Sequence, residues 1–395
     1  MNKSKLALVT ALFATQAMAN QHPKQADTIR VATFNVSMEA LNYVERVNEQ
    51  QPKVTGDELS KALSSDHQQI KNIAEIIQKV NPDILLLNEF DNKDNQALST
   101  FLNKYLAVGQ SGQSAIQYQY TFQGPVNTGV LLTEDATGDN KVTWPADTHG
   151  FGYFPGHFGM ALLSKFPINQ SKIRTFQHFL WQDMPNALVP VKEDTKAPWY
   201  PKNVWQQLRL SSKSHWDIPV VINGQSFHVL ASHPTPPVFD GPEDRNGKRN
   251  HDEIRFWHDY ISEGKASYIY DDNKSFGGLK SDSPFVILGD QNASSVDGDA
   301  IVEGITNLIT HPLIADPHPS SKAGAQNRPD NLNAKHHTAH WGIRADYVLP
   351  SKAGWKIVDA GIFWPTETSE EYRLIKDRQA SSDHRLVWVD LAIKK

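Results

Sequence analysis

Apolar positions along the chain fall into short continuous runs and into stretches with helical spacing. A run rich in β-branched and aromatic residues at 29–36 predicts a strand. A helix is predicted over 66–80, with Asp66 as its N-cap and Pro82 after its end. Its apolar residues share one helical face, at Ile70, Ile73, Ala74, Ile76, Ile77 and Val80. The apolar run 84–87 predicts a second, buried strand, so this part of the chain indicates a layered α/β domain.

The same kind of pattern continues to the end of the chain. Two strand-like runs, 219–222 and 226–232, are joined by Asn223-Gly224, which is a strong hairpin signal. Residues 250–261 have helical character. Further strands are predicted at 129–132, 160–164, 284–288, 345–349 and 385–391. The polar, Gly-rich segment 133–155 is too long for a simple turn, and we expect it to pass over the rim of a site.

The first nineteen residues have the order of a bacterial-type secretory signal. Lys3 and Lys5 precede an apolar stretch over 6–14, and Ala17-Met18-Ala19 places small residues where a signal peptidase reads them. We therefore expect residues 1–19 to be a signal peptide and the protein to be exported, periplasmic or secreted. No later run approaches the roughly 20 apolar residues that a transmembrane helix needs. Since no linker or internal repeat interrupts the rest, we expect 20–395 to form a single domain and the protein to be a monomer.

Composition narrows the chemistry. With 39 Lys+Arg against 44 Asp+Glu, the 395-residue chain has a net charge of -5, which argues against a strongly basic surface that holds duplex DNA. Nucleic-acid chemistry in a small, metal-neutralised cleft stays open. The chain contains no cysteine, which excludes disulfides, thiolate nucleophiles and Cys-ligated zinc or iron–sulfur sites. Catalysis must therefore use oxygen and nitrogen groups.

Polar side chains stand where the predicted strands end, and sites in layered α/β folds gather at such positions. They are Asn35, Glu89, His233, Asp290, Asn292, Asp346, Asp383 and His384. Any one of them has an ordinary reading as a turn former, a helix cap or a structural hydrogen-bonding group. Eight in succession, each beside an apolar run, indicate a site instead.

The oxygen-bearing members suit phosphoryl chemistry with a metal. Asn35, Glu89 and Asp383 offer the oxygen ligands that a hard divalent cation prefers, Mg²⁺ first, with Mn²⁺ or Ca²⁺ as alternatives. Such an ion polarises a phosphoryl oxygen and stabilises the leaving oxygen. Asp290 is the candidate to orient or deprotonate a water nucleophile. Asn292 is the candidate amide donor to the phosphate.

The histidines supply the remaining candidates. His233 and His384, if protonated, would place positive donors around the charge that develops in the transition state. Asp346 is a candidate to hold His384 in one tautomer and to raise its pKa. This is an Asp–His pair without a serine.

With these segments in this order, the chain resembles the endonuclease/exonuclease/phosphatase superfamily, which includes pancreatic-type deoxyribonucleases, abasic-site endonucleases, inositol polyphosphate 5-phosphatases and neutral sphingomyelinases. The matching segments are T-F-N-V (33–36), L-L-L-N-E (85–89), G-M-A-L-L-S-K-F-P-I (159–168), A-S-H-P (231–234), L-G-D-Q-N (288–292), R-A-D-Y-V-L-P-S (344–351) and S-S-D-H-R (381–385). The resemblance implies a four-layer α/β/β/α sandwich of two mostly antiparallel sheets flanked by helices. It also implies metal-dependent hydrolysis of a phosphate ester, with the eight residues in the roles given above.

Some positions depart from the family pattern. Ser37 stands where some of the nucleases carry a metal-binding Asp, and Asn88 stands where Gln is common. His157 falls near the active-site Tyr of the abasic-site enzymes and is a candidate substrate contact. These departures leave the hydrolytic core in place and make DNA-repair specificity doubtful. Arg245 and Arg249 precede a predicted helix and suggest an anion-binding loop, although a solvated loop with internal ion pairs explains them equally well.

The sequence therefore favours an exported, divalent-metal phosphoesterase that acts on a small phosphorylated organic substrate. Two alternatives stay open. One is an extracellular nuclease that cleaves DNA or RNA, since acidic secreted nucleases of this kind exist. The other is a non-catalytic binding module on the same scaffold, which the complete set of site residues disfavours.

Overall fold

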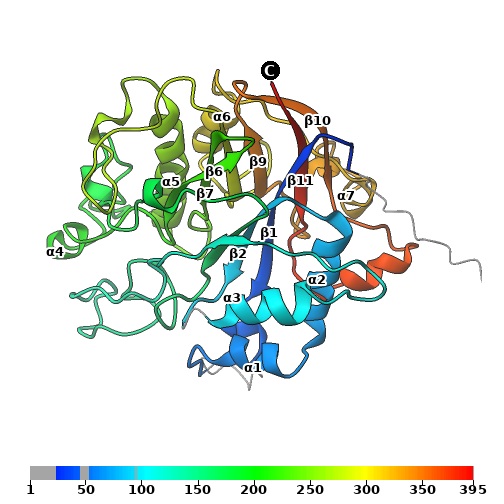
Figure 1. Cartoon of the computed structure of the whole chain (residues 1–395). Helices are drawn as coiled ribbons and strands as arrows, with labels where there is room; N and C mark the ends of the chain where they lie inside the picture. Colours follow the sequence, from blue (N-terminus) through cyan, green and yellow to red (C-terminus); the bar gives the residue numbers. More distant parts are fainter. Residues whose placement is uncertain (1–23, 45–52, 94–95, 395) are drawn as a thin grey trace, which may run out of the picture.

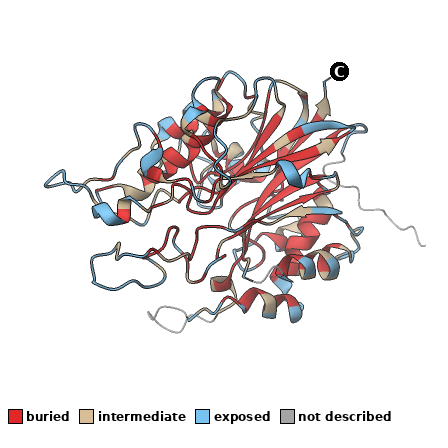
Figure 2. Cartoon of the chain, turned by 60° about the vertical axis from the view of Figure 1, so that its left-hand side comes forward, coloured by how far each residue is buried: buried red, intermediate tan, exposed pale blue. Residues whose placement is uncertain are grey.

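Two β-sheets packed face to face form the centre of the protein. The computed structural model describes residues 24–44, 53–93 and 96–394, so the predicted signal peptide lies outside the described residues. Figure 1 shows the sheets with helices on both outer sides, and Figure 2 shows that buried residues concentrate in the sheets and on the inner faces of the helices.

The first sheet has six strands and contains both ends of the described chain. Its order is β10 (Trp355–Ile362), β11 (Val387–Ile393), β1 (Ile29–Met38), β2 (Ile84–Phe90), β4 (Met160–Ser164) and β3 (Tyr120–Phe122). β1 pairs in parallel with β2 and antiparallel with β11, with Thr33 opposite Leu86 on one side and Val387 on the other. The parallel pairing brings the carboxyl ends of β1 and β2 to the same edge of the sheet.

The second sheet has five strands. Its order is β5 (Arg174–Thr175), β6 (His215–Ile222), β7 (Gln225–Ser232), β8 (Phe285–Asp290) and β9 (Asp346–Pro350). β6 and β7 form the predicted hairpin, in which Asn223 and Gly224 have φ angles of 52° and 80°. Two residues with positive φ match a type I′ turn, which explains the preference for Asn-Gly. β7 and β8 are parallel, and β8 and β9 are antiparallel.

Helices cover the outer face of each sheet and complete four layers. One layer contains α1 (Glu58–Ser64), α2 (Gln68–Val80) and α3 (Gln96–Thr100), and packs on the six-stranded sheet. The other contains α5 (Arg245–Ile261) and α6 (Val302–Ile309), and packs on the five-stranded sheet. The short helices α4 (Lys202–Trp205) and α7 (Lys322–Asn327) lie in connections. Apolar side chains of both sheets, such as Phe34 and Leu288, share one core between them. The predicted α/β/β/α sandwich is confirmed.

Some predicted elements differ from the observed ones. Residues 129–132 do not form a strand, and only isolated bridges such as Leu131 to Thr148 occur there. α2 begins at Gln68, because Asp66 adopts a φ of 57° and pairs with Lys104 at 2.9 Å instead of capping the helix. α5 begins at Arg245 and not at 250. Within the described ranges, no helix is long and apolar enough to cross a membrane.

Candidate active site

The ends of the central strands of both sheets bring the predicted residues together. β8 ends at Asp290, and the antiparallel register places Asp290 opposite Asp346, the first residue of β9. β7 runs parallel to β8 and ends one residue before His233. In the other sheet, Asn35 lies in β1 and Glu89 in β2. The topology thus collects residues that are distant in the sequence at one edge of the sandwich.

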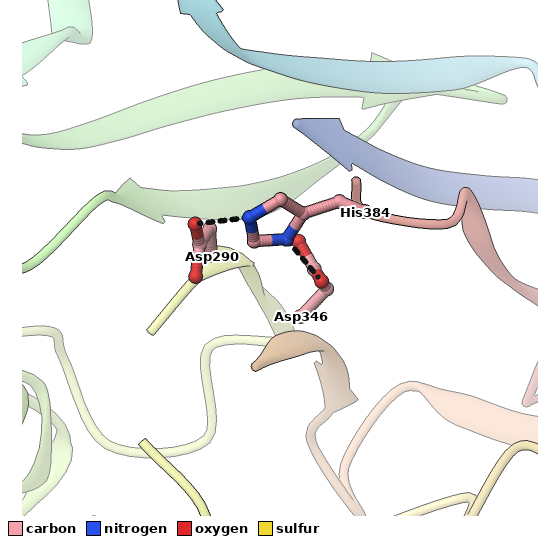
Figure 3. A group of neighbouring side chains, drawn as sticks. All are labelled: Asp290, Asp346 and His384. Atoms are coloured by element: carbon pink, nitrogen blue, oxygen red, sulfur yellow. Dashed lines mark hydrogen bonds and ion pairs between the residues drawn. The ribbon is translucent and has the colours of Figure 1, made fainter. Parts of the chain in front are cut away.

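A charge pair and a neighbouring carboxylate form the centre of this cluster (Figure 3). Nδ1 of His384 lies 2.9 Å from Oδ2 of Asp346, and Nε2 of the same ring faces Oδ2 of Asp290 at 3.6 Å. Asp346 also accepts a hydrogen bond of 2.7 Å from the hydroxyl of Thr338. Since all three members of the cluster are buried, the imidazole is fixed between two carboxylates.

Donors surround the Asp290 carboxylate. Its Oδ2 accepts a hydrogen bond of 3.1 Å from the amide of Asn35 and lies 3.4 Å from Nε2 of His233. Its Oδ1 accepts the backbone N–H of Asn292 at 2.9 Å. The backbone N–H of Asp290 donates to Oδ1 of Asn88 at 3.3 Å, which ties β8 to β2 across the two sheets. Asp290 is therefore held in place from both sides of the sandwich.

The two histidines differ in charge. Burial alone would lower the pKa of His384, but the carboxylates of Asp346 and Asp290 outweigh it and raise the pKa well above that of an ordinary histidine. Burial lowers the pKa of His233, and the nearby positive charges of Lys213 and His384 lower it further. Burial also raises the pKa of Asp290. The imidazolium form therefore belongs to His384, whereas the environment of His233 favours its neutral form, so the condition of protonation holds for only one of the two rings.

Asn292 lies two residues after Asp290, and its backbone adopts the left-handed conformation, with a φ of 51°. Its side-chain amide donates to the carbonyl of Pro234 at 3.1 Å, and the residue is buried. Asn292 therefore joins the end of β8 to the segment that follows His233. In this arrangement its amide contacts the backbone of the protein; whether it also reaches the phosphate stays a prediction.

Three carboxylates meet one guanidinium beside this cluster. Nη2 of Arg378 lies 3.2 Å from Glu39 and 3.7 Å from Glu89, and its Nη1 lies 3.5 Å from Asp383. Burial raises the pKa of Glu89, and Arg378 opposes this shift only in part. Glu89 and Asp383 thus lie beside the two terminal nitrogens of one guanidinium, and both stay candidate ligands for a cation.

A divalent cation fits these carboxylates. Glu89 and Asp383 are hard oxygen donors, and both already face a positive group. Their side chains are 19% and 28% exposed, so an ion from solvent can reach them. Asn35 differs from them, because it is buried with its amide nitrogen on Asp290 and its Oδ1 on the backbone N–H of Ser37 at 3.2 Å. Its role as a metal ligand stays a prediction.

His157 lies behind the carboxylates and not in the open part of the site. Its ring is fully buried, with Nε2 3.2 Å from Oε2 of Glu39, and it stacks on the ring of Phe158 at 3.7 Å between centroids. This placement suits a residue that orients Glu39. Glu39 and Arg378 were not among the predicted residues. A glutamate at the end of the apolar run that begins at Ile29 was the one available signal for Glu39, and nothing in the sequence pointed to Arg378.

The two arginines that were predicted to bind an anion, Arg245 and Arg249 in α5, have different surroundings. Arg249 is buried, and its guanidinium donates to the carbonyls of Leu210 and Arg209, both at 2.8 Å, so it braces a loop. Arg245 pairs with Glu243 and lies over the ring of Trp199, at the edge of an open pocket. Internal ion pairing thus accounts for Arg245, and neither contact requires an anion.

An aromatic residue borders the centre of the site. The ring of Trp341 meets the ring of His384 edge-on, with centroids 4.9 Å apart, and 44% of Trp341 is exposed. An exposed indole beside the charged imidazole offers a surface for the organic part of a ligand.

Comparisons with known proteins agree with this geometry. Residues 32–384 match the model of the Endonuclease/Exonuclease/phosphatase family. An endonuclease/exonuclease/phosphatase from Beutenbergia cavernae is similar in structure, with a TM-score of 0.50 and 17% identity over 93% of this chain and 72% of that one. No curated protein matches the sequence.

Two further solved structures are similar at lower scores. The catalytic domain of human Nocturnin, with a bound sulfate anion, has a TM-score of 0.46 and 14% identity over 94% of this chain and 97% of that one. A mutant beta toxin from Staphylococcus aureus, with bound magnesium ions, has a TM-score of 0.42 and 13% identity over 93% of this chain and all of that one, at 100%. Because the family model spans most of the sequence, the chain belongs to the Endonuclease/Exonuclease/phosphatase family and is a hydrolase of phosphoric ester bonds.

Proposed function

We propose that the protein is a divalent-metal phosphoesterase in which Asp290 activates a water molecule for in-line attack on phosphorus. One observation carries this proposal. The buried carboxylate of Asp290 lies beside the imidazolium of His384, which Asp346 holds. Two further carboxylates that suit a cation, Glu89 and Asp383, border this group. A base and a positive donor thus lie together, and His384 also acts on the pKa of Glu89, so a cation at Glu89 and Asp383 would complete the groups that phosphoryl transfer requires.

In the proposed hydrolysis, Asp290 acts as the general base. The Asp290 carboxylate takes a proton from water while the water oxygen forms a bond to phosphorus. The bond from phosphorus to the ester oxygen breaks on the opposite side, and the leaving oxygen takes a proton from solvent. The raised pKa of Asp290 suits a base that works near neutral pH, since the proton transfer is then close to balanced.

His384 stabilises the charge that builds on the phosphoryl oxygens. It is held as an imidazolium by Asp346, and its Nε2 is the end of the ring that faces the reacting region beside Asp290. A fixed positive donor in a buried site costs little reorganisation during the reaction, which is why such groups contribute strongly to rate. Asp346 acts as a positioning residue, because it contacts the ring and not the substrate.

Glu89 and Asp383 would hold the cation, with Mg²⁺ as the leading candidate and Mn²⁺ or Ca²⁺ as alternatives. When bound, the ion polarises a phosphoryl oxygen and neutralises charge on the leaving oxygen. Glu39 stands behind these ligands, fixed by His157 and by the backbone N–H of Leu41 at 2.7 Å. This support keeps a third negative charge near the cation without requiring direct ligation.

The substrate proposed is a small phosphorylated organic molecule. The net charge of -5 supports a small ligand more than a long polyanion, which is held by many basic contacts. The exposed ring of Trp341 beside His384 supports an organic group next to the phosphate. We also propose export through the signal at 1–19, which the order of charged, apolar and small residues supports.

Hydrolysis by the chain without residues 1–19 tests the proposal. A chromogenic phosphomonoester, a chromogenic phosphodiester and plasmid DNA are compared with Mg²⁺, Mn²⁺ or Ca²⁺ and with EDTA. We expect metal-dependent release of product from a small ester and an intact plasmid. Degraded plasmid with intact small esters would replace the proposal with a nuclease. No turnover of any substrate would favour a binding role.

A further inference from the structure

Lys213 is a buried lysine next to the site. It lies in the loop that precedes β6, and only 6% of the residue is exposed. Among the described residues, none is placed to form a hydrogen bond or an ion pair with its ammonium group. Lysines are rarely buried unless paired, because removing an ammonium ion from water is costly. The position therefore needs an explanation.

The loop that carries Lys213 is rigid and joined to the site. The backbone N–H of Ser212 donates to Oε1 of Glu253 at 2.6 Å, and the hydroxyl of Ser212 donates to the carbonyl of His233 at 3.3 Å. The carbonyl of Lys213 accepts the backbone N–H of Asn127 at 2.8 Å. These contacts fix the residue next to His233, so its burial is part of the local fold.

The charges around Lys213 are those of the site. Burial lowers its pKa, while the carboxylates of Glu253, Glu89 and Asp290 act in the opposite direction. Its positive charge in turn lowers the pKa of His233. The charge of Lys213 is therefore coupled to both the base and one candidate metal ligand, although no carboxylate in the described part of the chain forms an ion pair with it.

The acids that act on Lys213 have other hydrogen-bond partners. Glu253 is fully buried, and its two oxygens accept the backbone N–H groups of Ser212 at 2.6 Å and of Thr235 at 2.7 Å. Asp290 is likewise occupied by Asn35, His233 and the backbone of Asn292. A purely structural lysine would pair with one of these carboxylates. Within the described residues, neither Glu253 nor Asp290 does so, and the ammonium group stays available to a further negative group.

We propose that Lys213 binds a non-bridging oxygen of the phosphoryl group on the His233 side of the site. Because His233 is neutral, Lys213 supplies the positive charge there, while His384 supplies it beside Asp290. Lys213 is then a further catalytic residue, since the oxygen it contacts gains charge in the transition state. The inference rests on the proposed function for the reaction, but the anion site itself does not require turnover.

The test compares Lys213→Met with the unchanged chain. Methionine keeps much of the apolar stem and removes the charge. We expect kcat/KM to fall about 100-fold, the usual scale for one lost transition-state donor. We expect inorganic phosphate to bind Lys213→Met at least tenfold more weakly than it binds the unchanged chain, as measured by calorimetry. Lys356→Met removes an exposed lysine on β10 and serves as the control, with both values unchanged.

The unfolding midpoint of Lys213→Met gives a second measurement. A purely structural role for Lys213 predicts a lower midpoint, whereas the inference predicts a higher one. Removing an unpaired buried charge should raise the unfolding midpoint of Lys213→Met by a few degrees without phosphate. It should also abolish the upward shift that phosphate produces in the unchanged chain. A midpoint that falls, or a variant that does not fold, would show that Lys213 is structural and would overturn the inference.

The two proposals fail in different ways. If the unchanged chain hydrolyses phosphate esters and Lys213→Met keeps its kcat/KM and its affinity for phosphate, the inference is wrong and the proposed function stands. If no ester is hydrolysed but phosphate binding depends on Lys213, the proposed function is wrong and the anion site stands. Lys213→Arg, which keeps the charge, should retain part of the phosphate affinity.

Discussion

Oδ2 of Asp346 lies 2.9 Å from Nδ1 of His384, and this contact sets the charge of the ring. Both residues are buried, and the same Asp346 oxygen is also bound by the Thr338 hydroxyl. The opposite nitrogen of the ring faces Asp290. One carboxylate thus orients the imidazolium toward the other, which is the carboxylate that we propose as the base.

Asp346→Asn tests this arrangement. The amide has no charge to hold the imidazolium, so we expect kcat to fall by about 100-fold or more with a much smaller change in KM. Steady-state kinetics over a range of pH measures both values. Asp359→Asn, at an exposed position on β10, is the matched control and should behave as the unchanged chain does. An Asp346→Asn enzyme with normal kcat would contradict the positioning role.

Arg378→Gln tests the cation position. Without the guanidinium, Glu39, Glu89 and Asp383 lose the positive group that they share in the metal-free protein. We expect the metal-free variant to lose about 1 to 2 kcal/mol of stability, a modest value because 42% of the Arg378 side chain is exposed.

Added Mg²⁺ should then raise the unfolding midpoint of Arg378→Gln more than that of the unchanged chain. It should also bind more tightly by calorimetry, since a competing positive charge has been removed. Equal midpoints with and without Mg²⁺ in both proteins would argue against a cation at Glu89 and Asp383.

The stability of the fold should depend on pH through His215. This ring is buried and bound by Ser211 at 2.6 Å and by the carbonyl of Glu253 at 2.8 Å, and burial lowers its pKa to about 4. An unfolded chain has a histidine pKa of about 6.5. Between these values the unfolded state holds a proton that the folded state lacks, so the free energy of unfolding falls as pH is lowered through this window.

At pH 4 this effect of His215 lowers the free energy of unfolding by about 3 kcal/mol relative to neutral pH, and the loss vanishes above about pH 7. Urea unfolding at several pH values measures it. His215→Gln should have a shallower slope between pH 4 and 6.5 than the unchanged chain. Parallel slopes in the two proteins would show that another group controls the acid stability.

An ion pair in the first sheet joins the two ends of the described chain. Arg30 in β1 binds Asp390 in β11 through two hydrogen bonds of 2.7 and 2.8 Å, and both side chains are 1% exposed. Arg30→Met leaves Asp390 buried and unpaired, and should cost about 3 to 5 kcal/mol in urea unfolding. Arg30→Met combined with Asp390→Leu should recover most of that loss. A double variant as unstable as the sum of the singles would contradict this view.

Much of the fold was predictable because the strands that carry the site are apolar and bounded by turns. The runs before Asn35 and Asp290 and the run after His384 all correspond to observed strands, and Asn223-Gly224 formed the expected turn. β10 was missed because its buried residues lie at its two ends and the residues between them are intermediate or exposed, which leaves no clear apolar run. The run 129–132 was misjudged because it is bound by isolated contacts within loops and not by a neighbouring strand.

The sequence predicted those site residues that lie at the ends of apolar runs and have side chains suited to the chemistry. It did not predict the residues whose role depends on the folded surroundings. Arg378 lies in the connection between β10 and β11, and its role depends on three carboxylates that the fold brings to it. Lys213 lies in a polar loop, and its importance depends on burial, which no local pattern encodes. The charge of His233 was left open for the same reason, because only the folded surroundings lower its pKa.

Turnover by Asp290→Asn tests the central claim most directly. The substitution removes the base but keeps the shape and one acceptor oxygen for the donors around it. The account predicts that kcat for the best small phosphate ester falls by about 1,000-fold or more, with the unfolding midpoint within a few degrees of the unchanged chain. A folded Asp290→Asn protein that hydrolyses the ester at the unchanged rate would contradict the account.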